Sequence, residues 1–137
     1  MKHIIVPARP EELTKVQTFV DTELEALDCP PSAQFQIDLA VEEIFVNIAS
    51  YAYRPEVGEA EIRVEVNDDP LWVVIQFLDH GKPFDPLAKE DADTSPEAIE
   101  RRLGGLGILL VKRTMDSVTY AYENGRNVLT IEKKLNG

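Results

Sequence analysis

The chain has little cysteine, few basic residues and no long apolar run. Cys29 is its single cysteine, which excludes an intrachain disulfide and a multi-cysteine metal site. Lysine and arginine together number 14 against 25 acidic residues, and the formal net charge is −11. Non-specific binding to nucleic acids and to anionic membranes requires a basic surface, so this balance argues against both. The acidic surface is consistent with solubility or with a protein partner that has a basic face.

The apolar runs that are present are too short for export or membrane insertion. Residues 1–7 hold too short an apolar run for a signal peptide. The runs at 72–75 and 108–111 are far shorter than the roughly 20 apolar residues that cross a bilayer. We therefore expect a cytoplasmic protein that acts neither directly on nucleic acid nor at a membrane.

The apolar pattern indicates one domain over residues 1–137, because no stretch is typical of an interdomain linker. Residues 3–6 are expected to form a short strand. A helix is expected to begin near Pro10, with apolar residues at helical spacing as far as residue 27. A second helix is expected over about 32–53, with Ser32 as its N-cap.

Strand patterns dominate the remainder of the chain. The expected strands cover residues 62–66, 71–78, 118–122 and 128–135, with a further helix at 106–115. Asn124-Gly125 between the last two strands favours a two-residue hairpin turn. This order predicts an α+β fold, a two-layer sandwich in which helices cover one face of a mixed, mostly antiparallel sheet.

Three short polar motifs interrupt this scaffold. In the first, Glu43 and Asn47 are four residues apart on the second helix and so share a face, at the edge of its apolar stripe. A carboxylate there can act as a general base, and an amide oxygen is a hard ligand suited to Mg²⁺. Taken alone, the pair is more typical of solvated residues on a helix rim.

The second motif, Asp79-His80-Gly81, follows the most apolar strand. A carboxylate at a strand end can accept a hydrogen bond from an exocyclic amine such as that of adenine. Gly81 would let a flat base approach the backbone closely. In isolation an ordinary Asp/Gly turn is the more common explanation.

The third motif is a glycine-rich segment that directly precedes an apolar helix. It comprises Gly104, Gly105, Leu106 and Gly107. Glycines permit turns that direct several N–H groups inward, and a helix N-terminus favours an anion. No Lys-Ser or Lys-Thr follows, so the segment is not the usual P-loop.

The order of the three motifs resembles the GHKL ATPase superfamily (Bergerat fold), and within it the anti-sigma-factor serine/threonine kinases of bacterial partner-switching systems. The matching segments are Glu43-x-x-x-Asn47 for the N box, Asp79-x-Gly81-x-Pro83-Phe84 for the first glycine box, and Gly104-Gly105-Leu106-Gly107 with the helix after it for the second. Nearly the whole chain is covered.

The resemblance implies a role for each motif in binding ATP and Mg²⁺. Asn47 would coordinate the Mg²⁺ that bridges the phosphates, and Glu43 would polarise the attacking hydroxyl group or water. Asp79 would bind the adenine amine, with Gly81 beneath the ring. The glycine-rich segment, Gly104, Gly105, Leu106 and Gly107, would hold the phosphates. Residues 82–103, which carry three prolines and few large apolar side chains, would form the ATP lid.

The family also implies partners and a reaction. Its members phosphorylate a serine of a STAS-domain anti-anti-sigma protein, sequester a sigma factor, and often form homodimers. We therefore expect an ATP-dependent protein serine kinase. An ATP-gated binding module without efficient phosphotransfer is the alternative. The catalytic half of a sensor histidine kinase fits less well, because His3 and His80 do not lie on a dimerisation helix.

The sequence departs from the family pattern at two places. The last strand usually carries Gly-Thr-Thr, whose threonine assists adenine recognition, and here Arg126-Asn127-Val128 stands there. Either Asn127 substitutes for that threonine or the contact is lost. An arginine often precedes the second glycine box, and that position is Leu103 here.

Overall fold

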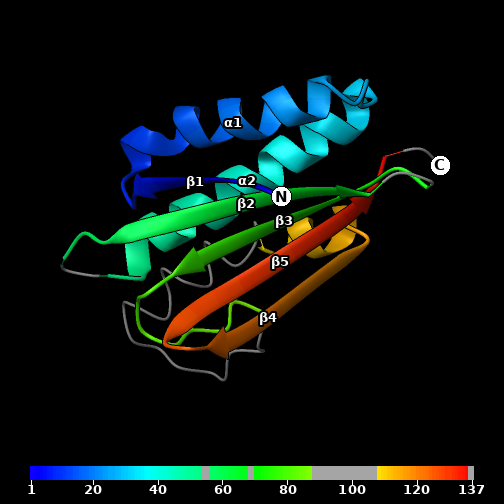
Figure 1. The fold of residues 1–137 in the computed structure, drawn as a ribbon. Coiled ribbons are helices and arrows are strands. Elements are labelled where there is room, and N and C mark those ends of the chain that lie inside the picture. The colour runs from blue at the N-terminus through cyan, green and yellow to red at the C-terminus, as the bar shows by residue number, and fades with distance from the viewer. Residues whose placement is uncertain (54–55, 68–69, 88–107, 136–137) are drawn as a thin grey trace.

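A computed structural model of the chain describes residues 1–53, 56–67, 70–87 and 108–135. Its five strands form one sheet in the order β1-β2-β3-β5-β4 (Figure 1). The strands are β1 (Lys2–Pro7), β2 (Glu59–Asn67), β3 (Trp72–Asp79), β4 (Ser117–Glu123) and β5 (Arg126–Lys134). Every pairing between them is antiparallel, so the parallel component that the sequence prediction allowed does not occur among the described strands.

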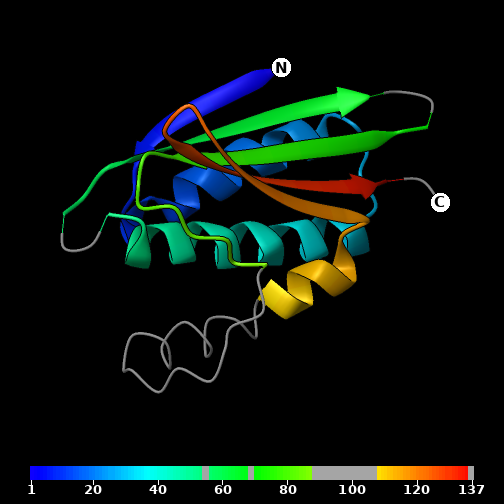
Figure 2. The ribbon, with the colours of Figure 1, turned by 90° about the horizontal axis from the view of Figure 1, so that it is seen from below.

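The helices lie together on one face of the sheet (Figure 2). They comprise a 3-10 turn η1 (Pro10–Glu12), α1 (Leu13–Glu25), α2 (Pro31–Tyr51) and a helical stretch at 108–114. The predicted two-layer α+β sandwich is therefore confirmed. In the described part of the chain, no helix combines the length and the apolar character needed to cross a membrane.

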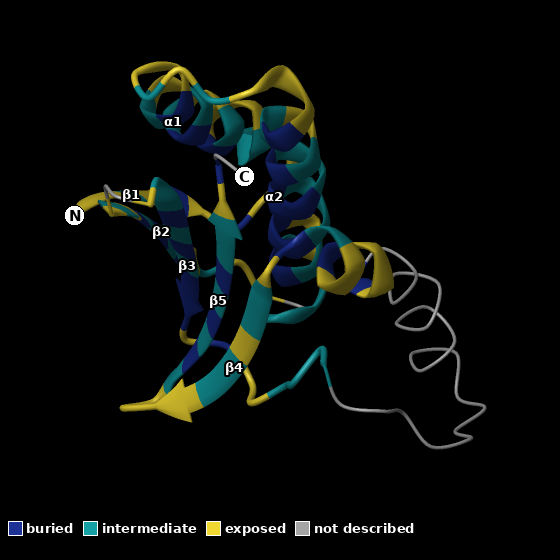
Figure 3. Cartoon of the chain, turned by 90° about the vertical axis from the view of Figure 1, so that its right-hand side faces the viewer, coloured by how far each residue is buried: buried dark blue, intermediate teal, exposed yellow. Residues whose placement is uncertain are grey.

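The core fills the space between the two layers, as the buried faces in Figure 3 show. Helix α1 contributes its i, i+4 series, and α2 contributes a stripe on the face toward the sheet. These buried residues are Val16, Val20, Leu24, Ile37, Val41, Ile44 and Ile48. They meet the inward-facing residues of the sheet, which alternate along each strand: Ile62, Val64, Ile75, Phe77, Leu129 and Ile131.

The start of α2 differs from the sequence prediction. The N-cap is Pro30, without a side-chain capping bond, and the helix begins at Pro31. Ser32, predicted as the cap, lies inside the first turn. The physical reason is that the Pro31 ring fixes a helical φ and lacks the N–H that would be unpaired at this position, so the proline sets the start.

The turn between β4 and β5 positions the site. Asn124 and Gly125 have φ values of 53° and 75°, the left-handed backbone that a type I′ hairpin requires, and the predicted hairpin is confirmed. The tight turn pairs Glu123 with Arg126 and fixes the register of β5. As a result, Asn127 lies directly opposite Asp79 on β3.

Candidate functional site

A cavity of about 260 Å³ lies between α2 and the end of the sheet formed by β3, β5 and β4. Apolar residues of α2 and the sheet form most of its wall, and aromatic and proline side chains after β3 form its rim. Its lining includes Ile44, Ile48, Tyr51, Ala52, Phe77, Pro83, Phe84, Pro86, Tyr120 and Leu129. The polar groups that line it are Asn47, Asp79, Lys82 and Asn127. A mostly apolar pocket with a few convergent polar groups is typical of a small-molecule site.

Asp79, at the end of β3, is the carboxylate of this cavity and is only 5% exposed. Its Oδ1 accepts hydrogen bonds from the Gly81 amide (2.8 Å) and from Asn127 Nδ2 (2.9 Å). Within the described residues no donor reaches its second oxygen. Burial raises the pKa of Asp79, while the two hydrogen bonds and the neighbouring His80 act in the opposite direction.

Gly81 is required by a close approach between backbones. A Cβ atom at this position would lie 2.2 Å from the carbonyl oxygen of Ala52 at the end of α2. The next residue, Lys82, donates its amide to the same oxygen at 3.1 Å. The segment that leaves β3 is therefore held against the C-terminus of α2, and a side chain at Gly81 would push the two apart.

Asn127 is the second buried polar residue of the cavity, with 7% of its surface exposed. Besides Asp79, its Nδ2 reaches the Lys82 carbonyl oxygen at 2.9 Å. Its Oδ1 accepts from the Tyr120 hydroxyl and, at 3.1 Å, from the Phe84 amide. The side chain thus joins β3, β4 and the segment after β3 at one point.

Sequence reasoning did not find the tyrosines that support this site. Tyr120 holds Asn127 from β4, and the hydroxyl of Tyr53, just after α2, accepts the His80 amide at 2.7 Å. The alternation of β4 indicated that Tyr120 shares a face with other core residues. Nothing in the sequence indicated that its hydroxyl would meet a buried amide.

Only one of the two residues of the first motif lines the cavity in the described structure. Asn47 lines the cavity, whereas Glu43, one turn earlier on α2, does not belong to the described lining. Both side chains are half-buried. Burial raises the pKa of Glu43, and the adjacent Glu42 adds to the effect. A raised pKa makes a carboxylate a better proton acceptor, which suits a general base.

The cavity thus brings together Asn47 and Asp79, with Gly81 immediately beside them. The glycine-rich segment lies outside the described residues. The same holds for all but the first residues, 82–87, of the expected lid.

An antiparallel sheet covered on one face by helices, with a cavity at the junction of the layers, agrees with the GHKL-type ATPase fold that the sequence predicts. The model of the histidine kinase-like ATPase domain family matches residues 6–133. The chain belongs to this family.

Relatives of the chain include serine-protein kinases called RsbW. That of Listeria monocytogenes serovar 1/2a is 26% identical over 129 residues, covering 90% of this chain and 81% of the relative. That of Staphylococcus epidermidis is 33% identical over 100 residues, covering 69% of this chain and 62% of the relative. The resemblance to GHKL ATPases and to anti-sigma-factor kinases is confirmed, and protein kinase activity is a property of these relatives.

Solved structures agree on the fold. The SiaB–SiaC complex from Pseudomonas aeruginosa contains a chain that superposes with a TM-score of 0.56 at 17% identity, covering 97% of this chain and 89% of that one. The histidine kinase AdeS of Acinetobacter baumannii superposes with a TM-score of 0.50 at 12% identity, covering 100% of this chain and 70% of that one.

Proposed function

We propose that this protein is an ATP- and Mg²⁺-dependent serine kinase that phosphorylates a STAS-domain protein and binds a sigma factor. The observation that carries the nucleotide part is the position of Asp79. It is a buried carboxylate in an apolar cavity, and one of its oxygens has no described donor. An exocyclic amine of adenine supplies such a donor, and Gly81 leaves the adjoining backbone without a side chain.

The donor set also fits a metal that is bound mainly through the nucleotide. Among the residues that the structure describes, no group of three or more His, Cys, Asp or Glu could hold a metal ion. Mg²⁺ in phosphoryl-transfer sites keeps several waters and takes phosphate oxygens, with one or two protein ligands. A single amide, that of Asn47 in the cavity wall, supports this mode of binding. When bound, the metal would neutralise charge on the phosphates.

The residues of α2 would carry the chemistry. Phosphoryl transfer needs positioning, charge neutralisation and a group that orients the nucleophile. Glu43, with its raised pKa, would take the proton of the attacking serine hydroxyl group as that oxygen bonds to the γ-phosphorus and ADP leaves. We place Gly104, Gly105, Leu106 and Gly107 at the phosphates. Residues 82–103 we assign to the lid, on the family pattern.

The relatives support the protein substrate. They are serine-protein kinases, and the alignment with the first of them covers most of both chains. The surplus of acidic residues, 25 against 14, suits a partner with a basic face. We also propose that the protein is cytoplasmic and forms a homodimer, as the family pattern implies.

One observation favours the alternative, an ATP-gated binding module without efficient transfer. Glu43 is the only described residue assigned to the chemical step, and it lies outside the described lining of the cavity. In that case ATP would set the affinity for the partner without being consumed.

Glu43→Gln discriminates between these functions. With the wild-type kinase, label from γ-labelled ATP should pass to a cognate STAS-domain protein. With the variant, the rate of labelling should fall by about two orders of magnitude. Thermal stabilisation by ATP and Mg²⁺ should persist in both proteins. Glu42→Gln, the adjacent acid, is the matched control and should retain transfer. Absence of labelling by the wild-type protein, with ATP binding intact, would establish the binding module instead.

A further inference from the structure

Asp79 and Asn127 are the two buried polar residues of the described structure, and they contact each other. They face one another across the β3–β5 ladder. The family pattern has a threonine in the region of Asn127, and here an asparagine side chain makes the contact with Asp79.

The hydrogen-bonding capacity of the Asn127 side chain is already filled by the protein. Its amide nitrogen has two hydrogens, which serve Asp79 Oδ1 and the Lys82 carbonyl, each at 2.9 Å. Its oxygen has two lone pairs, which serve the Tyr120 hydroxyl and the Phe84 amide. The Asn127 side chain therefore has no donor or acceptor left for a nucleobase. Any effect of Asn127 on nucleobase binding must act through a neighbouring residue.

That neighbour is the Asp79 carboxylate. Two donors, the Gly81 amide and Asn127 Nδ2, converge on its Oδ1. They leave Oδ2 as the acceptor available in the cavity, and they stabilise the charged form of a buried carboxylate, which burial disfavours. A fixed carboxylate oxygen attracts an amine. It repels a carbonyl oxygen, which presents lone pairs and no hydrogen.

We infer that Asn127 is a positioning residue for nucleobase selection, holding Asp79 so that purine nucleotides with a 6-amino group bind in preference to those with a 6-oxo group. The inference rests on the proposed nucleotide site. It assigns to Asn127 an indirect role in place of the direct contact that a threonine would make.

Asn127→Asp tests the inference with the smallest change of shape. The new carboxylate keeps an oxygen for Tyr120 and Phe84, but it places an acceptor instead of a donor beside Asp79. Affinities for ATP and for inosine triphosphate are measured by calorimetric titration. The wild-type protein should prefer ATP, and in the variant the ratio of the two affinities should fall by about tenfold or more. If Asn127 had a merely structural role, the substitution would weaken the binding of both nucleotides equally and leave the ratio of the two affinities unchanged.

Asn124→Asp is the matched control, because it makes the same chemical change at an exposed turn residue. Its ratio should equal that of the wild type. Tyr120→Phe is a second variant that removes one partner of the Asn127 oxygen and leaves the fold intact. Its ratio should move in the same direction as that of Asn127→Asp, by a smaller factor.

A double-mutant cycle tests whether the effect passes through Asp79. In an Asp79→Ala background, titrated at nucleotide concentrations high enough to fill the weakened site, Asn127→Asp should give the same ratio of affinities as Asp79→Ala alone. An unchanged ratio in both Asn127→Asp and Tyr120→Phe, or a wild-type protein that binds the two nucleotides equally, overturns the inference and leaves the proposed function standing. A wild-type protein that binds neither nucleotide overturns the proposed function itself.

Discussion

At the scale of single residues, Asp79 is subject to opposing demands of folding and binding. As a buried carboxylate it destabilises the folded state, because its charge is removed from water. As an acceptor in an apolar cavity it would select ligands that present a hydrogen-bond donor. Polar residues that are retained in a core despite such a penalty frequently belong to functional sites.

Asp79→Asn should separate the two demands. The pKa of Asp79 is raised in the folded state, so folding favours the protonated carboxyl group. The free energy of unfolding therefore falls as pH rises and Asp79 becomes charged. The amide escapes this loss, and the ligand-free variant should be more stable than the wild type near pH 8. Urea unfolding without ligand measures this difference, which should shrink toward pH 5.

The same variant should lose its response to ATP, because an amide at position 79 can no longer present a fixed carboxylate oxygen. Thermal denaturation with ATP and Mg²⁺ measures this response: the rise in Tm expected for the wild type should be absent or much reduced in the variant. A variant stabilised by ATP as strongly as the wild type would remove Asp79 from the adenine site.

At the scale of elements, the junction between the end of α2 and the segment after β3 determines the shape of the cavity. Gly81 lies against the Ala52 carbonyl, and Lys82 donates to the same oxygen. The contact joins the helical layer to the sheet beside Asp79. It therefore positions the wall of the cavity beside Asp79.

Gly81→Ala should disrupt this junction. Its Cβ would lie 2.2 Å from a backbone oxygen that cannot move aside without displacing α2. We expect a loss of about 2–4 kcal/mol in the free energy of unfolding, together with weaker ATP binding. Gly125→Ala is the control. Its Cβ meets nothing within 4 Å, but its φ of +75° is strained for alanine. It should lose about 1 kcal/mol and retain ATP binding. Equal ATP affinity in both variants would contradict the role given to Gly81.

The same scale shows what the sequence could and could not predict. The Asn124-Gly125 turn and the apolar stripe of α2 were predictable, because each depends on residues adjacent along the chain or on one helix. The start of α2 was mispredicted at Ser32, where two local signals competed and proline prevailed. The bond between Asn127 and Asp79 was not predictable, because it joins residues 48 apart and depends on β5 lying beside β3.

At the scale of the whole molecule, acidic side chains lie not only on the surface but also between the two long helices, α1 and α2. Asp38 on α2 has a buried Oδ1 with no hydrogen-bond partner, and it lies near Asp21 and Glu25 of α1. Burial, a side-chain hydrogen bond with Asp21 and the two nearby carboxylates raise the pKa of Asp38 to about 7. Protonation of Asp38 would therefore relieve the repulsion between its carboxylate and those of α1.

This proton should make stability depend on pH. The pKa of Asp38 in the unfolded chain is the ordinary 3.8, so the folded state holds a proton that the unfolded state has released. The stabilisation is complete below that value and is lost as pH rises through about 7. Asp38 is half-buried, and solvent screening limits the effect to roughly 1–2 kcal/mol.

Urea unfolding of the wild type and of Asp38→Asn, which mimics the protonated form, measures the effect. The wild type should lose stability between about pH 5 and pH 8, and the variant should lose less. Glu11→Gln, on the exposed side of η1, is a control that should follow the wild type. Parallel profiles for all three proteins would show that the proton on Asp38 does not stabilise the helical layer.

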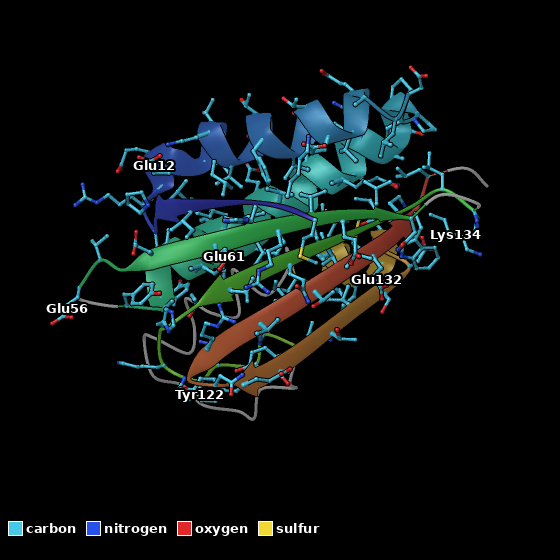
Figure 4. All side chains as sticks on the ribbon, viewed as in Figure 1. Glu12, Glu56, Glu61, Tyr122, Glu132 and Lys134 are labelled. Atoms are coloured by element: carbon cyan, nitrogen blue, oxygen red, sulfur yellow. The ribbon has the colours of Figure 1, made fainter. Side chains whose placement is uncertain are left out.

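The charges on the open face of the sheet follow a different pattern. A carboxylate oxygen of Glu61 lies 2.7 Å from Arg63 Nε, and the other lies 3.6 Å from a guanidinium nitrogen of Arg126 (Figure 4). Further along the sheet, the indole N–H of Trp72 donates to Glu132, and the ammonium group of Lys134 lies over the indole ring. The arginines lower the pKa of Glu61. Opposite charges are thus paired around Glu61 on the sheet, whereas the carboxylates of Asp38, Asp21 and Glu25 gather between the helices.

The pairing of β3 with β5 has a kinetic consequence. The strand pairing that places Asn127 opposite Asp79 closes a long loop, and such contacts form late in folding because their entropic penalty must be met first. Interactions absent from the transition state change the rate of unfolding rather than the rate of folding. A nucleotide held by Asp79 should therefore lengthen the lifetime of the folded protein and leave its folding rate almost unchanged.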